Sequence, residues 1–176
     1  MAGRTTVARG RPDPHALHVY LLEVAAGDAR EGAWSRLLAP EEAARRARLR
    51  HPASRSEYTA ARALVRTALS LHAPLVSPAQ WRIEADPRGR PRIVSPGTAL
   101  DFNLAHTRGL VCCLIFTGRR AGIDVEWMDR PGDLRRVARR FFSPDEVADL
   151  ERQREPSAFR RRFFDYWTLK EAWLKA

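Results

Sequence analysis

Lysine is almost absent from this chain of 176 residues. The sequence contains 31 basic residues, and Lys170 and Lys175 are its only lysines, so every other cation is an arginine. A composition rich in arginine and alanine favours arginine wherever either cation serves, and two neighbouring lysines can then arise by chance. The alternative is that these positions need a compact ammonium rather than a planar guanidinium.

Cysteine is also scarce, with Cys112 and Cys113 as the only two. Neighbouring residues on a strand point to opposite faces and seldom bridge each other, which argues against a fold held by disulfides. We expect both thiols to be reduced packing residues of a cytoplasmic protein. A vicinal metal or redox pair is the alternative.

Long hydrophobic runs are missing as well. The longest run, from Leu110 to Phe116, has the length of a strand, which argues against a membrane-spanning segment. The first 16 residues contain Arg, Pro and Gly but no apolar core, so they do not resemble a secretory signal. Residues 1–15 are predicted to form a flexible tail.

Acidic residues are outnumbered, and the net charge is +10. Such a charge implies a polyanionic partner: nucleic acid, an anionic membrane, a phosphorylated cofactor or an acidic protein. Charge alone does not choose among these. Aromatic residues are not interleaved with arginine on the expected strands, which argues against nucleic acid.

The periodicity of apolar residues and the turn residues predict a mixed α+β fold, in one domain or in two small lobes that share a core. Strands are predicted at 16–24, in a hairpin over 80–95, and at 100–107, 109–116 and 120–128. Helices are predicted at 39–50, 53–72, 133–142, 143–153 and 155–176.

Two of these helices share an internal repeat. An aromatic residue, a threonine, an alanine and a cation recur in one register, and a Pro-acidic helix start precedes each copy. The matching sets are Tyr58, Thr59, Ala63 and Arg66, and Trp167, Thr168, Ala172 and Lys175. The repeat predicts two similar halves, with chance similarity of two helical hairpins as the alternative. Arg62 stands in the first copy where Glu171 stands in the second, which would place an anion pocket beside a carboxylate.

A pair of carboxylates suggests a metal site. Asp124 and Glu126 are two residues apart on the strand predicted at 120–128, so they share one face. With a third carboxylate from a facing helix they would suit Mg²⁺, which prefers oxygen ligands. Two solvent-facing acids on an edge strand are the alternative. Gly122, just before Asp124, would let another backbone or a ligand approach closely.

The last predicted helix supplies that third carboxylate. On a helical wheel Lys170 falls within the apolar stripe and Glu171 on its edge, where charges need partners, so we expect both to be functional. For Lys175, one turn beyond Glu171, an ordinary surface pair is an adequate explanation. His106 is a packed or surface residue unless it lies near a diphosphate, to which it could donate hydrogen bonds.

Four segments in this order resemble the 4′-phosphopantetheinyl transferases of the Sfp type: "FNLAHT", "GIDVE", "FFSPDE" and "WTLKEAWLKA". The resemblance covers residues 17–176. It implies a pseudo-dimer of two similar α+β halves with coenzyme A between them. The N-terminal half would be residues 16–100, on the side of the cofactor 3′-phosphate. The C-terminal half would be residues 101–176, on the metal and catalytic side, and it lacks strands that the relatives carry beyond the last helix.

The resemblance also implies a reaction of the holo-[acyl-carrier-protein] synthase type. Phosphopantetheine would pass from coenzyme A to a serine of an acidic acyl or peptidyl carrier protein, with release of 3′,5′-ADP. The enzyme would be monomeric and cytoplasmic, with neither nucleic acid nor a membrane as partner. A binding module for coenzyme A or the carrier, impaired in catalysis, is the alternative, and a nucleic-acid binder with coincidental motifs is a third.

The implied site residues follow from the matched motifs. Asp124, Glu126 and Glu171 would hold Mg²⁺, and Glu171 would also be the base for the carrier serine. Lys170 would take part in catalysis at the phosphates. Coenzyme A would be bound by Arg45, Arg62, Arg90, His106, Lys170 and Lys175. The sequence departs from the family at Ala105, where relatives usually carry serine.

Overall fold

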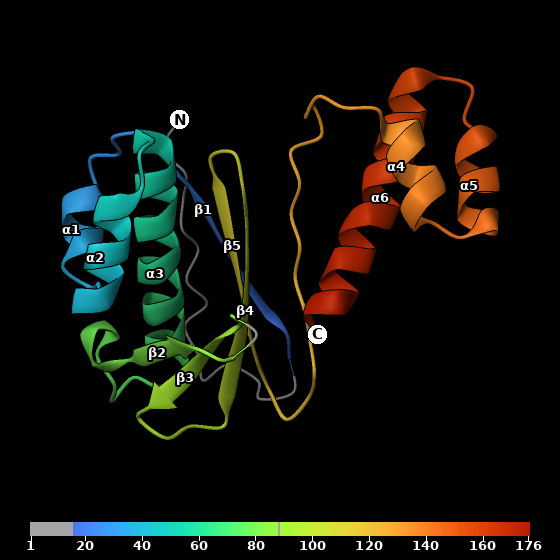
Figure 1. Cartoon of the computed structure of the whole chain (residues 1–176). Coiled ribbons are helices and arrows are strands. Elements are labelled where there is room, and N and C mark those ends of the chain that lie inside the picture. Colours follow the sequence, from blue (N-terminus) through green and yellow to red (C-terminus); the bar gives the residue numbers. More distant parts are fainter. Residues whose placement is uncertain (1–15, 88) are drawn as a thin grey trace.

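The computed structural model describes residues 16–87 and 89–176 (Figure 1). The predicted tail at 1–15 lies outside the described residues. The elements are, in chain order, β1 (His18–Glu23), α1 (Glu31–Ser35), α2 (Pro40–Arg48), α3 (Pro52–His72), the 3₁₀ turn η1 (Pro78–Gln80), β2 (Arg82–Ala85), β3 (Pro91–Ser95), β4 (Leu100–Thr107), β5 (Leu110–Thr117), α4 (Leu134–Phe141), α5 (Pro144–Glu151) and α6 (Pro156–Lys175).

A small antiparallel sheet forms the centre of the fold. Its strand order is β1-β5-β4, and β2 and β3 form a separate hairpin. Helix α3 lies along one face of the sheet (Figure 1). Val65 and Leu69 of α3 pack there against Phe102 and Ile115, with Trp81 closing the end of this core. The mixed α+β class predicted from the sequence is confirmed.

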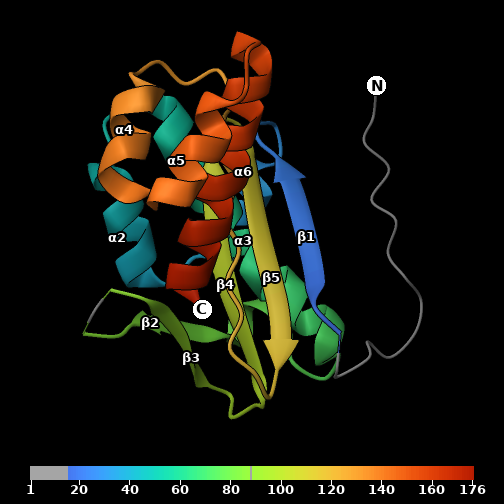
Figure 2. The same cartoon turned by 90° about the vertical axis from the view of Figure 1, so that its right-hand side faces the viewer.

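Helices α4, α5 and α6 pack on one another on the other side of the sheet (Figure 1). Their core is aromatic, with Phe142 between Phe163 and Tyr166 at ring-centroid distances of 5.2 and 5.8 Å. The extended segment 118–133 joins β5 to α4 and runs between the sheet and these helices (Figures 1 and 2). The helix α6 therefore brings its last turn towards the sheet while its first turns stay among the other helices.

The helix starts that belong to the predicted repeat have the same local structure. Both α2 and α5 begin with proline, and a glutamate three residues after the N-cap reaches back to the N-cap backbone. Glu42 accepts a hydrogen bond from Ala39 N at 3.0 Å, and Glu146 accepts one from Ser143 N at 2.7 Å. The pseudo-dimer itself stays a prediction.

Most predicted elements are confirmed, with three differences. The strand predicted at 120–128 is wrong, because the structure has no strand there. The short helix α1 and the turn η1 were not predicted. The division of the chain at residue 100 stays a prediction, although β4 and β5, which it assigned to the second half, form one sheet with β1.

Cys112 and Cys113 are free thiols on β5, and both are buried. Burial raises the pKa of each thiol, so both are held in the protonated, unreactive form. Their predicted role as packing residues is confirmed. Within residues 16–87 and 89–176, none of the helices combines the length and the apolar character needed to cross a membrane.

The contact between α3 and β1 predicts a pH dependence of stability. His72 ends α3, and its Nε2 lies 2.8 Å from the hydroxyl of Tyr20. Burial, and then the neighbouring His18, lower the pKa of His72 from 6.5 to about 4. Because the unfolded chain takes up the proton more readily, the neutral ring stabilises the fold above pH 6.5, and this contribution is lost as the pH falls towards 4.

We expect the melting temperature of the wild type to fall between pH 6.5 and 4.5, and that of His72→Gln to fall less over the same interval. The carboxylates with lowered pKa values, such as Glu31 and Glu146, lose their contribution only below about pH 4.5, outside this interval. Thermal melts at several pH values measure the difference. Parallel curves for the two proteins would contradict the role of His72.

Candidate functional site

A cleft of about 510 Å³ lies where the β2–β3 hairpin meets β4 and the end of α6. Figure 2 shows the last turn of α6 beside this hairpin. The cleft is lined by Asp86, Gly89, Arg90, Pro91, Arg92, Phe102, Asn103, Leu104, Arg120, Leu174, Lys175 and Ala176. Four of these residues are cations and one is a carboxylate, so the cleft favours an anionic ligand.

The segment with the predicted metal carboxylates is held beside β4 by side chains. Ile123 N donates to Asn103 Oδ1, and Trp127 N donates to Thr107 Oγ1, both at 3.0 Å. In a paired strand, these backbone amides would donate to backbone oxygens of the neighbouring strand. Here they donate to side chains of β4 instead, so the segment forms no backbone ladder with β4. This explains why the strand predicted at 120–128 is absent.

Asp124 lies in this segment and faces α6. Its Oδ1 is 2.5 Å from Lys175 Nζ, and its side chain is only 8% exposed. Its other oxygen, Oδ2, is buried and has no hydrogen-bond partner among the described residues. A buried carboxylate oxygen without a partner is costly, so this position favours an additional cation.

Glu126 faces α6 as well. Its Oε1 accepts a hydrogen bond from Trp167 Nε1 at 3.0 Å and pairs with Arg130 at 3.1 Å. Glu171 is half-buried on α6, and no hydrogen bond or ion pair joins it to the part of the chain that the structure describes. The contacts of Asp124 and Glu126 show that both point to α6, although the strand on which their spacing was expected to give them one face is absent.

The carboxylates fit Mg²⁺ in kind. Residues 16–87 and 89–176 contain no group of three His, Cys, Asp or Glu side chains already gathered for a metal. Mg²⁺ nevertheless keeps several waters and needs only one or two protein carboxylates. The unpaired Oδ2 of Asp124 is a carboxylate oxygen of this kind, with Glu126 two residues away.

The two lysines point to different partners. Lys175 reaches Asp124, whereas Lys170 Nζ lies 2.8 Å from Glu146 Oε2 on α5 and above the ring of Phe142. Burial alone would raise the pKa of Glu146, but hydrogen bonds from Lys170 and from Ser143 lower it below its usual value. Lys170 thus joins α5 to α6, and its predicted part in catalysis stays a prediction.

Two of the three arginines predicted for the first half, Arg45 and Arg62, lie on one patch of α2 and α3. The guanidinium groups of Arg45 and Arg62 stand over the ring of Tyr58, at 5.7 and 5.2 Å from its centroid. Arg62 also pairs with the buried Glu42 at 3.5 Å, and Arg66 pairs with Glu42 at 2.9 Å. Neither Arg45 nor Arg62 lines the cleft. Arg66 was identified in the sequence only as part of the repeat, without a predicted role.

Arg90 and His106 differ in their place. Arg90 lines the cleft, and its guanidinium lies 3.5 Å from the backbone oxygen of Ala176. His106 is exposed on β4 and does not line the cleft. Asn103, Arg92 and Arg120 also line the cleft and were not predicted from the sequence. Asn103 stands in the quoted segment "FNLAHT", but nothing in the sequence brings Arg120 to the end of α6.

The approach of another backbone to Gly122 is confirmed. A Cβ atom at Gly122 would overlap the carbonyl oxygen of Ala172 and lie 2.8 Å from Ala176 N. Asn103 strengthens this junction, because its Nδ2 donates to the backbone oxygen of Lys175 at 3.4 Å while its Oδ1 holds Ile123. The last turn of α6 is therefore seated directly on the segment that carries Asp124.

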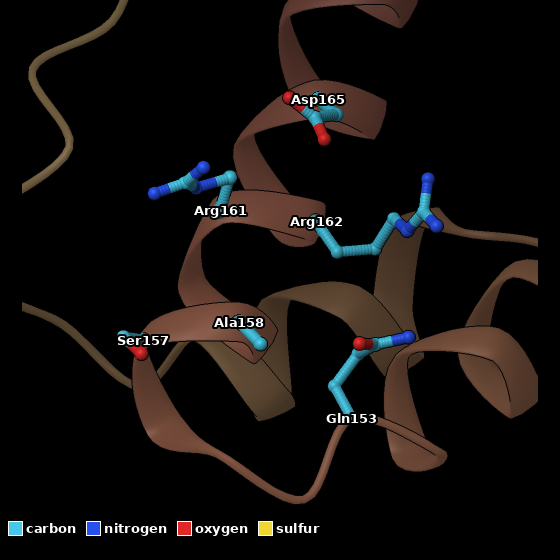
Figure 3. Close-up of a pocket in the computed structure, with 6 residues that line it drawn as sticks. All are labelled: Gln153, Ser157, Ala158, Arg161, Arg162 and Asp165. Carbon is cyan, nitrogen blue, oxygen red and sulfur yellow. The ribbon is translucent and has the colours of Figure 1, made fainter.

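A second hollow, of about 350 Å³, lies between the start of α6 and the end of α5 (Figure 3). Arg161 and Arg162 point in opposite directions there, and Arg162 is engaged with Asp149 at 3.2 Å. No residue predicted for the site lines this hollow. The cleft beside Lys175 is therefore the candidate site.

Comparison with known proteins supports the resemblance. Residues 120–176 match the model of the 4′-phosphopantetheinyl transferase superfamily. The chain is 37% identical over 143 residues to the 4′-phosphopantetheinyl transferase HetI of Nostoc sp., covering 79% of this chain and 59% of that protein. It is 30% identical over 178 residues to the phosphopantetheinyl transferase of Thraustochytrium sp., covering 93% of this chain and 61% of that protein.

These findings support the assignment of the chain to the 4′-phosphopantetheinyl transferase superfamily. The chain spans about three fifths of the length of the curated relatives that it matches, with 59% of the first and 61% of the second. The matched region 120–176 contains the three predicted metal carboxylates and both lysines.

The close contact between Gly122 and the last turn of α6 predicts that one added methyl group destabilises the protein. We expect Gly122→Ala to push the last turn of α6 off the segment and to lower stability by about 1–3 kcal/mol. Gly32→Ala is the control, because a Cβ there has no atom within 4 Å and alanine favours a helix. Thermal and urea melts of both variants measure the effect. Equal stability of the two would show that the contact at Gly122 is easily relieved.

Proposed function

We propose that the protein is an Mg²⁺-dependent phosphopantetheinyl transferase of the Sfp type, acting as a holo-[acyl-carrier-protein] synthase. It transfers 4′-phosphopantetheine from coenzyme A to a serine of an acidic acyl or peptidyl carrier protein and releases 3′,5′-ADP. The superfamily match over residues 120–176 supports this proposal. The net charge of +10 agrees with two anionic substrates. The buried free thiols agree with a cytoplasmic location.

The observation that carries the proposal is the environment of Asp124. A buried carboxylate with one open oxygen stands at the edge of a cleft lined by cations, one of which is its own partner Lys175. The transfer of a phosphoryl-linked group from a diphosphate requires cations that stabilise the phosphates and a carboxylate that can hold a metal ion beside them.

Asp124, Glu126 and Glu171 would hold Mg²⁺, whose charge would stabilise the diphosphate as the P–O bond breaks. Lys175, Arg90 and Arg120 orient the phosphates from the cleft side. Glu171 takes the proton of the carrier serine hydroxyl, directly or through one water, and so makes the oxygen nucleophilic.

The activity is tested by intact-mass analysis of a panel of apo carrier proteins incubated with coenzyme A and Mg²⁺. A mass gain of one phosphopantetheine on a carrier supports the proposal. No gain on any carrier, together with measurable binding of coenzyme A, would instead favour a binding module.

Within this assay, we expect Asp124→Asn to lower the transfer rate by at least about a hundredfold, because an amide is a weak ligand for Mg²⁺ and no longer balances the charge. Asp129→Asn, an exposed acid five residues away, is expected to keep its activity within about twofold. Circular dichroism checks that both variants are folded. Normal transfer by Asp124→Asn at limiting Mg²⁺ would refute the metal role.

The two groups of arginines lead to a further expectation about substrate recognition. We propose that Arg45 and Arg62 read the 3′-phosphate and that Arg90 and Arg120 hold the diphosphate. The support is the charge of each group and, for the second, its place in the cleft.

Arg62→Ala should reduce the preference for coenzyme A over 3′-dephospho-coenzyme A by about tenfold, as expected for the loss of a charged hydrogen bond. Arg120→Gln should weaken both ligands by similar factors and leave that preference intact. Arg119→Gln, an exposed neighbour outside the cleft, serves as the control for net charge. Calorimetric titration measures the dissociation constants. An unchanged preference in Arg62→Ala would show that the α2–α3 patch does not bind the 3′-phosphate.

A further inference from the structure

The contact between Lys175 and Asp124 involves only one of the two oxygens of a buried carboxylate. Lys175 Nζ takes Oδ1 at 2.5 Å, while Oδ2 is buried without a hydrogen-bond partner among the described residues. One ammonium thus neutralises the charge of Asp124 without satisfying its second oxygen. The carboxylate is charge-balanced in the protein alone, yet its second oxygen lacks a partner, which favours a second cation.

Lys175 lies on the border between this carboxylate and the cleft. Its backbone oxygen is held by Asn103 Nδ2 at 3.4 Å, so its position in the chain is fixed. Its side chain is 32% exposed and lines the cleft together with Arg90 and Arg120. A lysine stem has several rotatable bonds, so its head can turn from Asp124 to an anion in the cleft without movement of α6.

The choice of lysine at this position follows from the same geometry. A guanidinium presents a planar fork that covers both oxygens of a carboxylate, whereas an ammonium covers one. In a sequence that otherwise uses arginine for nearly every cation, lysine at 175 leaves Oδ2 of Asp124 open.

We propose that Lys175 is a place-holder for the divalent cation. Its ammonium neutralises Asp124 while no divalent cation is bound, and it turns to the anion in the cleft when a divalent cation occupies the open oxygen. This inference rests on the proposed function for the identity of the two ligands. Its consequence is that the binding of the cation and of the phosphate-bearing ligand is coupled through a single side chain.

The coupling has a definite sign. A unit positive charge at about 4 Å from a divalent cation weakens its binding by more than tenfold even at an effective dielectric constant of about 20. An anion that draws Lys175 away therefore tightens the binding of the cation. By thermodynamic reciprocity, the cation tightens the binding of the anion by the same factor.

The test uses Mn²⁺ as the probe and the full chain as the protein. Free Mn²⁺ is followed by electron paramagnetic resonance in titrations of the wild type, Lys175→Met, Lys175→Arg and Arg161→Met. We expect Lys175→Met to bind Mn²⁺ at least tenfold more tightly than the wild type. Arg161→Met, which removes an equal charge from an exposed position of the same helix outside the cleft, should stay within twofold of the wild type.

Melting curves provide a second readout that does not depend on activity. Without a divalent cation, Lys175→Met leaves Asp124 buried and unpaired, so it should melt below the wild type, and Mn²⁺ should restore it. Lys175→Arg keeps the charge and tests the idea even where Lys175→Met fails to fold. It should bind Mn²⁺ more weakly than the wild type, because the guanidinium covers both oxygens of Asp124.

A final titration adds saturating coenzyme A, corrected for Mn²⁺ bound by coenzyme A alone. Coenzyme A should tighten Mn²⁺ binding by a larger factor in the wild type than in Lys175→Met. Equal or weaker Mn²⁺ binding by Lys175→Met, or unchanged binding by Lys175→Arg, overturns the place-holder role. The titrations with Mn²⁺ alone contain no substrate, so their outcome is independent of whether transfer to a carrier is found.

Discussion

The contact of two backbones at Gly122 is the constraint on which the rest of the site depends. Only a residue without a side chain lets the last turn of α6 rest on the segment after β5, where a Cβ atom would overlap Ala172. Asn103 then fastens both partners to β4 with one amide group. Without this seat Lys175 would not reach Asp124, and the end of α6 would not form one wall of the cleft.

Local patterns were enough to predict most of the fold. The alternation and the turn residues of β1–β5, and the proline and glutamate starts of α2 and α5, are properties of short stretches that the structure repeats. The error at 120–128 has a different origin. The stretch has the composition of a strand, but whether it joins a ladder depends on the residues opposite, and Asn103 and Thr107 use their side chains to bind its amides.

In the candidate site, too, local patterns predicted some features, whereas contacts between distant segments could not be predicted. The spacing of Asp124 and Glu126 predicted that they share one face of a strand. The strand is absent, yet Asp124 contacts Lys175 and Glu126 contacts Trp167, so both side chains reach α6. Arg92 and Arg120 could not be found this way, because only the folding of the hairpin and of α6 brings them to one cleft. On a helical wheel Lys170 was assigned to the site. Its partner Glu146 lies on the neighbouring helix, which a wheel of one helix does not include.

The arrangement of the helices has a mechanical consequence. Helices α4, α5 and α6 pack chiefly on one another, and they meet the sheet through the extended segment 118–133 and the last turn of α6. The two packed parts of the molecule therefore meet through a small number of contacts. One wall of the cleft belongs to each part, the β2–β3 hairpin to the first and the end of α6 to the second. A ligand that touches both walls would therefore hold the two parts of the molecule together.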